Sequence, residues 1–193
     1  MSSIAAAQVS HRDRLVTAAA RFTAENGWAE LTMAKLADLV GVSRQTVYNE
    51  IGGKPQLAEA MVLRELALFL EVVDSAFPDN PQDLVAAIEA ASFRVLELAA
   101  TDPLLHAILS STQGAESELL PLLTTNSEPL LGTAGQMIRG HIAGYEVPLE
   151  EHRVEVLIDM VVRLVLSHVM QPTAQPAETA ETIGWIAASV LSA

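Results

Sequence analysis

The chain has 193 residues, half of them hydrophobic and only 4% aromatic, with a formal net charge of −13 and no cysteine. This composition favours a helical protein of one large or two small domains, and the lack of cysteine excludes disulfides, iron–sulfur clusters and thiol nucleophiles. There is no basic start followed by an apolar run, and the longest apolar segment, residues 154–170, contains charged side chains, so we expect a cytoplasmic protein without a secretory signal or membrane span.

The first predicted helix begins after Ser10. Ser10 and Asp13 have the spacing of a capping box, in which the side chains satisfy free amides at a helix start. The apolar residues that follow recur at the spacing of one helical face, namely Leu15, Ala18, Ala19 and Phe22. Asn26 and Gly27 end this helix.

Two short helical runs lie on either side of Gly41. Thr32 is a plausible N-cap for the first, and Ser43 for the second. Gly41 can adopt the left-handed conformation that ends a helix and reverses the chain. Two short helices joined in this way form a helix-turn-helix, and the second would keep Val47 and Ile51 on its inner side.

The second run carries polar side chains on its remaining faces. Arg suits the acceptor edge of guanine and Gln suits adenine, so Arg44 and Gln45 are the candidates for reading bases. Thr46, Tyr48 and the lysines are candidates for phosphate contacts, although Tyr48 could pack as a half-buried ring and Lys35 could be merely exposed. The full set of candidate DNA contacts is Thr32, Lys35, Ser43, Arg44, Gln45, Thr46, Tyr48 and Lys54.

The acidic charge is concentrated in the later part of the chain. Residues 1–57 contain six Lys and Arg and five acidic residues, whereas residues 58–193 contain five and nineteen. Nonspecific affinity for DNA scales with the number of neutralised phosphates, so a nearly neutral head should depend on specific contacts and dimer geometry.

Helical segments account for the rest of the chain. Gly52-Gly53 indicates a flexible break, and Lys54-Pro55 begins a helix that runs to about residue 77. Further helices are expected over residues 81–100, in a short run after Pro103, over 130–143, 148–170 and 177–191. We therefore predict an all-α protein of about nine helices, with a DNA-binding domain at residues 1–53 and a second domain at 54–193.

The N-terminal residues resemble the TetR family of transcriptional repressors. The matching features, in chain order, are Ala18–Phe22, Gly27-Trp28, Thr32, Leu36-Ala37, Val40–Ser43, Thr46–Tyr48, Lys54 and Leu57. The resemblance implies a homodimeric repressor that binds a palindromic operator and is released when an effector in the C-terminal domain shifts the fourth helix. Ile51-Gly52-Gly53 departs from the family pattern, and Tyr48–Glu50 resembles a subset linked to lipid or alkane metabolism in actinobacteria.

The resemblance also implies an effector pocket among helices five to eight. Most candidate residues there are apolar, which favours a fatty acyl chain, a hydrocarbon or a hydrophobic drug, although each could equally belong to the ordinary core. The candidates are Phe93, Leu96, Leu104, Leu105, Ile108, Met137, Ile138, His141, Met160, Arg163 and Leu164.

The last two predicted helices carry more apolar surface than one pair can hide within a monomer. Paired with a second copy they would form a four-helix bundle, so we expect a homodimer. The predicted interface residues are Leu157, Val161, Val165, Val169, Ile183, Ile186 and Val190.

Other classes of protein are less well supported by the sequence. None of the five histidines follows an acidic residue by three positions, which argues against a carboxylate-bridged metal site, and there is no phosphate-binding loop or G-x-S-x-G motif. We therefore predict no enzyme activity, cofactor or metal. An effectorless DNA-binding regulator or an architectural protein remains the alternative.

Overall fold

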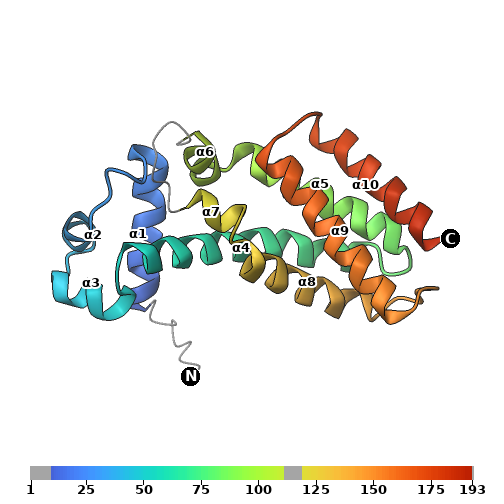
Figure 1. Cartoon of the computed structure of the whole chain (residues 1–193), viewed down its shortest axis with the longest axis horizontal. Helices are drawn as coiled ribbons and strands as arrows, with labels where there is room; N and C mark the ends of the chain where they lie inside the picture. Colours follow the sequence, from blue (N-terminus) through green and yellow to red (C-terminus); the bar gives the residue numbers. More distant parts are fainter. Residues whose placement is uncertain (1–9, 111–118, 193) are drawn as a thin grey trace, which may run out of the picture. The chain divides into compact units, whose positions relative to one another are not determined.

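The computed structural model describes residues 10–110 and 119–192, and the regular structure in these ranges is entirely helical, as predicted (Figure 1). These described ranges contain ten helices, against the nine or so expected for the chain, and one of them, Leu120–Leu123, is a single turn. Their bounds are α1 His11–Asn26, α2 Met33–Val40, α3 Arg44–Ile51, α4 Lys54–Asp79, α5 Leu84–Thr101, α6 Pro103–Ser110, α7 Leu120–Leu123, α8 Glu128–Ile142, α9 Glu151–Met170 and α10 Pro176–Leu191.

The helices belong to two compact units. Unit 1 contains α1, α2, α3, the start of α4 as far as Arg64, and α6. Unit 2 contains α4 from Glu65 onward, α5, α8, α9 and α10. The boundary between the two units therefore lies within the continuous helix α4, and α6 belongs to unit 1. The predicted domain boundary at residues 53/54 stays a prediction.

Unit 1 is organised around α1. Its buried face packs on α2, α3 and α6, and includes Leu15, Val16, Ala19, Ala20 and Thr23. Trp28 and Leu31, in the turn before α2, are buried as well.

Two arginines of α1 bind the ends of the other helices in unit 1. Arg12 donates from Nη1 to the carbonyl oxygen of Glu50, near the end of α3, at 2.7 Å. Arg14 donates from Nη2 to the carbonyl oxygen of Val40, the last residue of α2, at 3.2 Å. Carbonyls at a helix C-terminus lack intrahelical donors and carry partial negative charge, so both contacts favour a cation. They orient α2 and α3 relative to α1.

The link between α3 and α4 is short and hydrogen-bonded. Gly52 has φ 92° and ψ −126°, a conformation that favours glycine, and its N–H donates to the carbonyl of Tyr48. The N–H of Gly53 donates to Oε1 of Gln56 at 2.9 Å, and the carbonyl of Gly53 accepts from Leu57. The glycine pair that we predicted as a flexible break is therefore a turn in which both N–H groups have acceptors.

Unit 2 has its own hydrophobic core. Helices α5, α9 and α10 pack together, and α8 packs on α9. The core includes Phe77 from α4, Ile88 from α5, Ile142 from α8, Leu157 from α9 and Ile183 from α10. Among the described residues, no helix is long and apolar enough to cross a membrane.

Candidate nucleic-acid interface

The helix-turn-helix predicted around Gly41 is present. Thr32 caps α2, with its side chain accepting from the N–H of Lys35 at 3.1 Å, and Ser43 caps α3, accepting from Thr46 at 3.0 Å. Gly41 lies in the left-handed region at φ 74° and ψ 37°, which ends α2 as predicted. The caps and the turn follow directly from these residue types.

Helix α3 has one buried side and one polar, exposed side. Val47 and Ile51 are buried, whereas Arg44, Gln45 and Asn49 are exposed and Tyr48 is 52% exposed. About half of the Tyr48 side chain is thus accessible, so its role as a phosphate contact and its alternative role as a half-buried packing ring both stay predictions.

The side-chain amides of Gln45 and Asn49 are hydrogen-bonded to each other, and Asn49 was not among the predicted DNA contacts. Gln45 donates from Nε2 to Oδ1 of Asn49 at 2.8 Å. This pairing leaves Oε1 of Gln45 as an acceptor and Nδ2 of Asn49 as a donor. Their spacing of four residues was the sequence signal for the contact.

Most cations of unit 1 already have partners within it. Lys35 donates to the carbonyl of Glu30 at 2.9 Å, and Lys54 donates to the carbonyl of Trp28 at 3.1 Å. Arg12 and Arg14 bind the carbonyls at helix ends. The exposed Arg21 pairs with Glu25 one turn away, and the hydrogen bond to that carboxylate is the main reason why the pKa of Arg21 is raised. Of the Lys and Arg residues in the described stretch 10–57, only Arg44 makes neither a hydrogen bond nor an ion pair. It is the cation best placed to bind an external partner.

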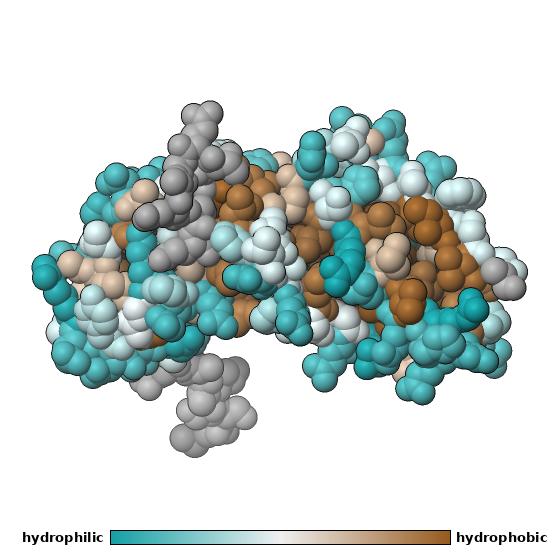
Figure 2. All heavy atoms as spheres, viewed as in Figure 1, coloured by the Kyte–Doolittle hydropathy of each residue, from teal (hydrophilic) through white to brown (hydrophobic). Residues whose placement is uncertain are grey.

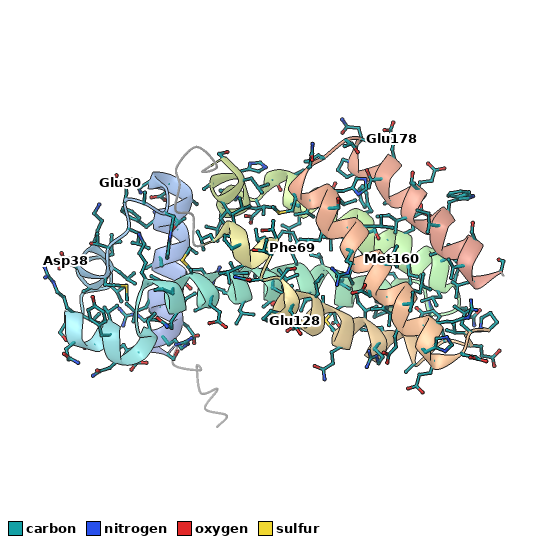
Figure 3. The ribbon with its side chains drawn as sticks, in the orientation of Figure 1. Glu30, Asp38, Phe69, Glu128, Met160 and Glu178 are labelled. Atoms are coloured by element: carbon teal, nitrogen blue, oxygen red, sulfur yellow. The ribbon has the colours of Figure 1, made fainter. Side chains whose placement is uncertain are left out.

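The predicted effector residues do not form one site within either unit. Leu104, Leu105 and Ile108 are buried in α6, which belongs to unit 1. The others lie in unit 2, where Met137, Ile138 and Leu164 pack against the core. Phe93 is half-buried and Leu96 buried on α5, while Met160, labelled in Figure 3, and Arg163 are exposed on α9.

His141 has partners of its own. Its Nε2 lies 3.0 Å from Oδ1 of Asp74, and its ring stacks on Phe77 with 4.4 Å between the ring centres. These contacts join α8 to α4, so a structural role accounts for His141. No group of three acidic or histidine side chains in the described residues could hold a metal ion.

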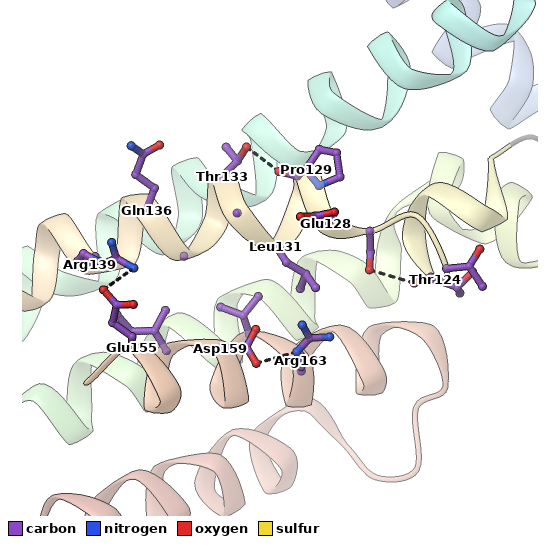
Figure 4. A pocket seen from close by; sticks show the side chains of 16 residues that line it. Thr124, Glu128, Pro129, Leu131, Thr133, Gln136, Arg139, Glu155, Asp159 and Arg163 are labelled. Carbon is purple, nitrogen blue, oxygen red and sulfur yellow. Dashed lines mark hydrogen bonds and ion pairs between the residues drawn. The ribbon is translucent and has the colours of Figure 1, made fainter. Parts of the chain in front are cut away.

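A groove of about 1020 Å³ lies between α8 and α9 (Figure 4). Its walls carry two ion pairs, Arg139 with Glu155 at 3.2 Å and Arg163 with Asp159 at 2.8 Å. Its other lining residues are Thr124, Thr125, Ser127, Glu128, Pro129, Leu131, Gly132, Thr133, Gly135, Gln136, Ile158 and Val162. The groove is polar, and Arg163 is the one predicted effector residue that lines it.

The predicted dimer residues separate into core and surface. Leu157 is 4% and Ile183 1% exposed, because both point into the core of unit 2. Val161 and Val165 pack on that core from its edge, Val169 and Ile186 are half-buried, and Val190 is exposed.

Large apolar side chains outside this set of seven residues are more exposed. Trp185 is 69% exposed, and Val156 and Met160 are each more than half exposed. Hydrophobic residues (brown) gather over α9 and α10 at the right of Figure 2.

These features define a helix-turn-helix DNA-binding regulator with a helical C-terminal region. The comparisons with known proteins agree. Residues 15–61 match the family model described as bacterial regulatory proteins, tetR family, and residues 83–189, more than half of the chain, match the bacterial tetracycline repressor C-terminal domain. The chain belongs to the TetR family of transcriptional regulators, which are DNA-binding proteins and not enzymes.

Individual relatives extend the comparison over most of the chain. The HTH-type transcriptional regulator AlkX of Mycobacterium tuberculosis (strain ATCC 25618 / H37Rv) is 29% identical over 161 residues, which are 83% of this chain and 75% of the relative. The crystal structure of the TetR family repressor AlkX from Dietzia sp. strain DQ12-45-1b, implicated in biodegradation of n-alkanes, has a TM-score of 0.76 at 22% identity, covering 95% of this chain and 96% of that one. FadR from Bacillus subtilis, solved with stearoyl-CoA, has a TM-score of 0.58 at 14% identity, covering 92% and 97%. The two structures show likeness of fold.

Proposed function

We propose that this regulator is a homodimeric repressor that reads a palindromic operator with α3 and is released by an apolar effector. The observation that carries the proposal is the exposed side of α3, where Gln45 is paired with Asn49 and Arg44 makes no hydrogen bond or ion pair with the described residues. The start of α3 is fixed by the Ser43 cap and the turn at Gly41, and its end lies at Gly52.

The side chains of α3 suit base edges. The guanidinium of Arg44 can donate twice to the O6 and N7 atoms of guanine. The free acceptor of Gln45 and the free donor of Asn49 match the N6 and N7 atoms of adenine. Tyr48 and Thr46 complete the surface as candidate phosphate contacts.

Symmetry sets the spacing of the two heads. Recognition helices of a dimer enter successive major grooves when they lie about 34–36 Å apart. The exposed apolar side chains of α9 and α10, with Trp185 at their centre, are the surface we propose for pairing with a second copy. Val161, Val165, Val169, Ile186 and Val190 belong to this proposed interface, whereas the buried Leu157 and Ile183 do not.

A hydrocarbon or fatty acyl effector is the first class to test. The predicted effector residues are mainly apolar, and α6 and α5 contribute buried leucines to them. The Dietzia relative is implicated in n-alkane degradation, which makes long-chain alkanes the leading compounds. The polar groove between α8 and α9 is a poor match for such a molecule.

DNA selection from a random pool, followed by fluorescence anisotropy on the enriched sequence, tests the reading surface. Arg44→Ala should weaken operator binding by about 10- to 100-fold for each half-site, since a good bidentate base contact provides about 1–3 kcal/mol of discrimination. The matched control is Arg21→Ala, which removes the same charge from an exposed pair outside the reading surface. Equal affinities for the wild type and the Arg44 variant would exclude α3 as the reader.

The effector is tested on the preformed complex. Alkanes and fatty acids of ten to sixteen carbons should release the operator in a saturable, chain-length-dependent manner. A complex that none of these compounds releases, and a melting temperature that none of them raises, would favour an effectorless regulator instead.

A further inference from the structure

Lys54 lies where the DNA-binding unit passes into its longest helix. It is the first residue of α4, and its Nζ donates to the carbonyl oxygen of Trp28, 26 residues earlier in the chain. The same ammonium lies 4.7 Å from the centre of the Trp28 ring. The side chain of Trp28 is buried, so the indole offers a fixed face to the cation.

The carbonyl of Trp28 is the organising acceptor of the α1–α2 turn. It accepts from the N–H of Leu31 at 3.1 Å as well as from Lys54. A carbonyl oxygen has two lone pairs, and both are used here. The contact with Lys54 therefore completes the hydrogen bonding of this turn.

The N-terminus of α4 has fewer free N–H groups than an ordinary helix start. Helix starts bind anions through their free N–H groups. At this helix the N–H of Gly53 already donates to Gln56, and Pro55 has no N–H to offer. A lysine that extended away from the unit to a phosphate would leave both the Trp28 carbonyl and the indole face, whereas a phosphate beside the bound ammonium would have to accept from one of its other two N–H groups.

A second lysine makes a useful comparison. Lys35, on α2, donates to the carbonyl of Glu30 and lies 5.0 Å from the centre of the Phe22 ring. The two lysines thus hold neighbouring carbonyls of one turn, but from different helices. Lys54 is half-buried and joins the turn to α4, whereas Lys35 is exposed and joins it to α2.

We propose that Lys54 is a positioning residue that fastens the start of α4 to the α1–α2 turn, and that it is not a phosphate contact. The chain itself joins α4 to α3 through the hydrogen-bonded Gly52-Gly53 turn. Lys54 adds a second attachment, at Trp28, so a displacement of α4 moves both ends of the helix-turn-helix together. The regulatory part of this inference rests on the proposed function, while the attachment itself does not.

The salt dependence of operator binding separates the two roles. Lys54→Met keeps the unbranched stem over Trp28 and removes the ammonium. If two protomers each used Lys54 on a phosphate, the slope of log K against log salt would fall by about 1.8 in the variant, or ~12-fold between 50 and 200 mM salt. A positioning residue leaves that slope unchanged while it lowers the melting temperature.

The spectrum of Trp28 gives a readout that needs no DNA. The chain has two tryptophans, so the indole N–H signal of Trp28 can be assigned by its loss in Trp28→Phe. Lys54→Met should shift this signal, and Lys54→Arg should restore its position because Arg also donates and lies over aromatic faces. Lys35→Met is the matched control and should leave the signal in place.

Each result decides between the roles. A shifted indole signal that Arg restores, with an unchanged salt slope, supports the attachment. An unmoved indole signal in Lys54→Met, or a slope reduced by about 1.8, overturns it. If the wild-type protein bound no DNA, the proposed function would fail while the indole signal still decided the role of Lys54.

Discussion

Alanine at Gly52 would place a Cβ in a backbone conformation that glycine alone reaches without strain. Gly52 has φ 92° and ψ −126°, whereas Gly41 has φ 74° and ψ 37°, inside the left-handed helical region. Other residues enter that region at a cost of about 1–2 kcal/mol, but the region of Gly52 is closed to side chains. Gly41 and Gly52 should therefore respond differently to the same substitution.

The expected magnitudes follow from strain and from the unfolded state. At Gly41 a Cβ would meet nothing within 4 Å, so the strain is offset only by the gain of about 0.4–1 kcal/mol from a less flexible unfolded chain. Gly41→Ala should cost about 0.5–1 kcal/mol. At Gly52 the nearest atom is the side chain of Gln56 at 3.4 Å, which is ordinary contact, so the cost is mainly conformational. Gly52→Ala should cost about 2 kcal/mol.

Gly132 provides a control in which the same substitution should raise the free energy of unfolding. It lies within the continuous helix α8, and a Cβ there would also meet nothing within 4 Å. Gly132→Ala should stabilise unit 2 by about 0.8–1 kcal/mol, because Ala is the better helix former. Although it contains three glycines, α8 runs unbroken from Glu128 to Ile142.

Urea unfolding monitored by circular dichroism, with calorimetry alongside, would measure the series. If the units unfold in separate steps, the Gly41 and Gly52 variants should shift one step and the Gly132 variant the other. A Gly52 variant as stable as the Gly41 variant would contradict the conformation described for the α3–α4 link. A destabilised Gly132 variant would contradict the open space beside α8.

Three further outcomes are expected. Arg12→Ala removes the donor to the Glu50 carbonyl and should lower the unfolding free energy by about 0.5–1.5 kcal/mol in urea titrations; no change would show that water replaces the guanidinium. Trp185→Ser should convert a dimer to a monomer in sedimentation equilibrium at micromolar concentration, and an unchanged mass would remove α10 from the interface. Burial and, to a lesser degree, Asp83 raise the pKa of Tyr145, so the folded state favours the neutral phenol. The neutral phenol therefore contributes to stability below a pH of about 10, and this contribution is lost as the pH rises through the raised pKa of Tyr145. In Tyr145→Phe the urea midpoint should fall less steeply over the same rise in pH.

Local chemistry explains what could be predicted from the sequence. Ser10, Thr32 and Ser43 each accept from a backbone N–H three residues on, as capping side chains do. Gly41 adopts the left-handed conformation because no other residue type there would do so cheaply. These features need no knowledge of the rest of the fold.

Contacts between distant residues could not be predicted in this way. Arg12 and the Glu50 carbonyl are 38 residues apart, and nothing in either segment indicates the other. Lys54 and the Trp28 carbonyl are 26 residues apart, and their hydrogen bond likewise has no signal in either segment. In α9, apolar residues occupy several sides of the helix, so periodicity could not decide that Leu157 faces the core while Val156 and Met160 face outward.

Several Lys and Arg side chains of unit 1 are hydrogen-bonded to carbonyls of the same unit, which affects how the regulator finds its operator. Nonspecific binding to DNA comes almost entirely from neutralised phosphates, whereas base contacts carry the specificity. Because Arg12, Arg14, Lys35 and Lys54 are bound to carbonyls within the unit, they contribute less to a general attraction than their charges suggest. Random DNA should therefore compete weakly, and the ratio of operator to random affinity should change little with salt. A steep salt slope on random DNA would mean that these side chains leave their carbonyls when DNA approaches.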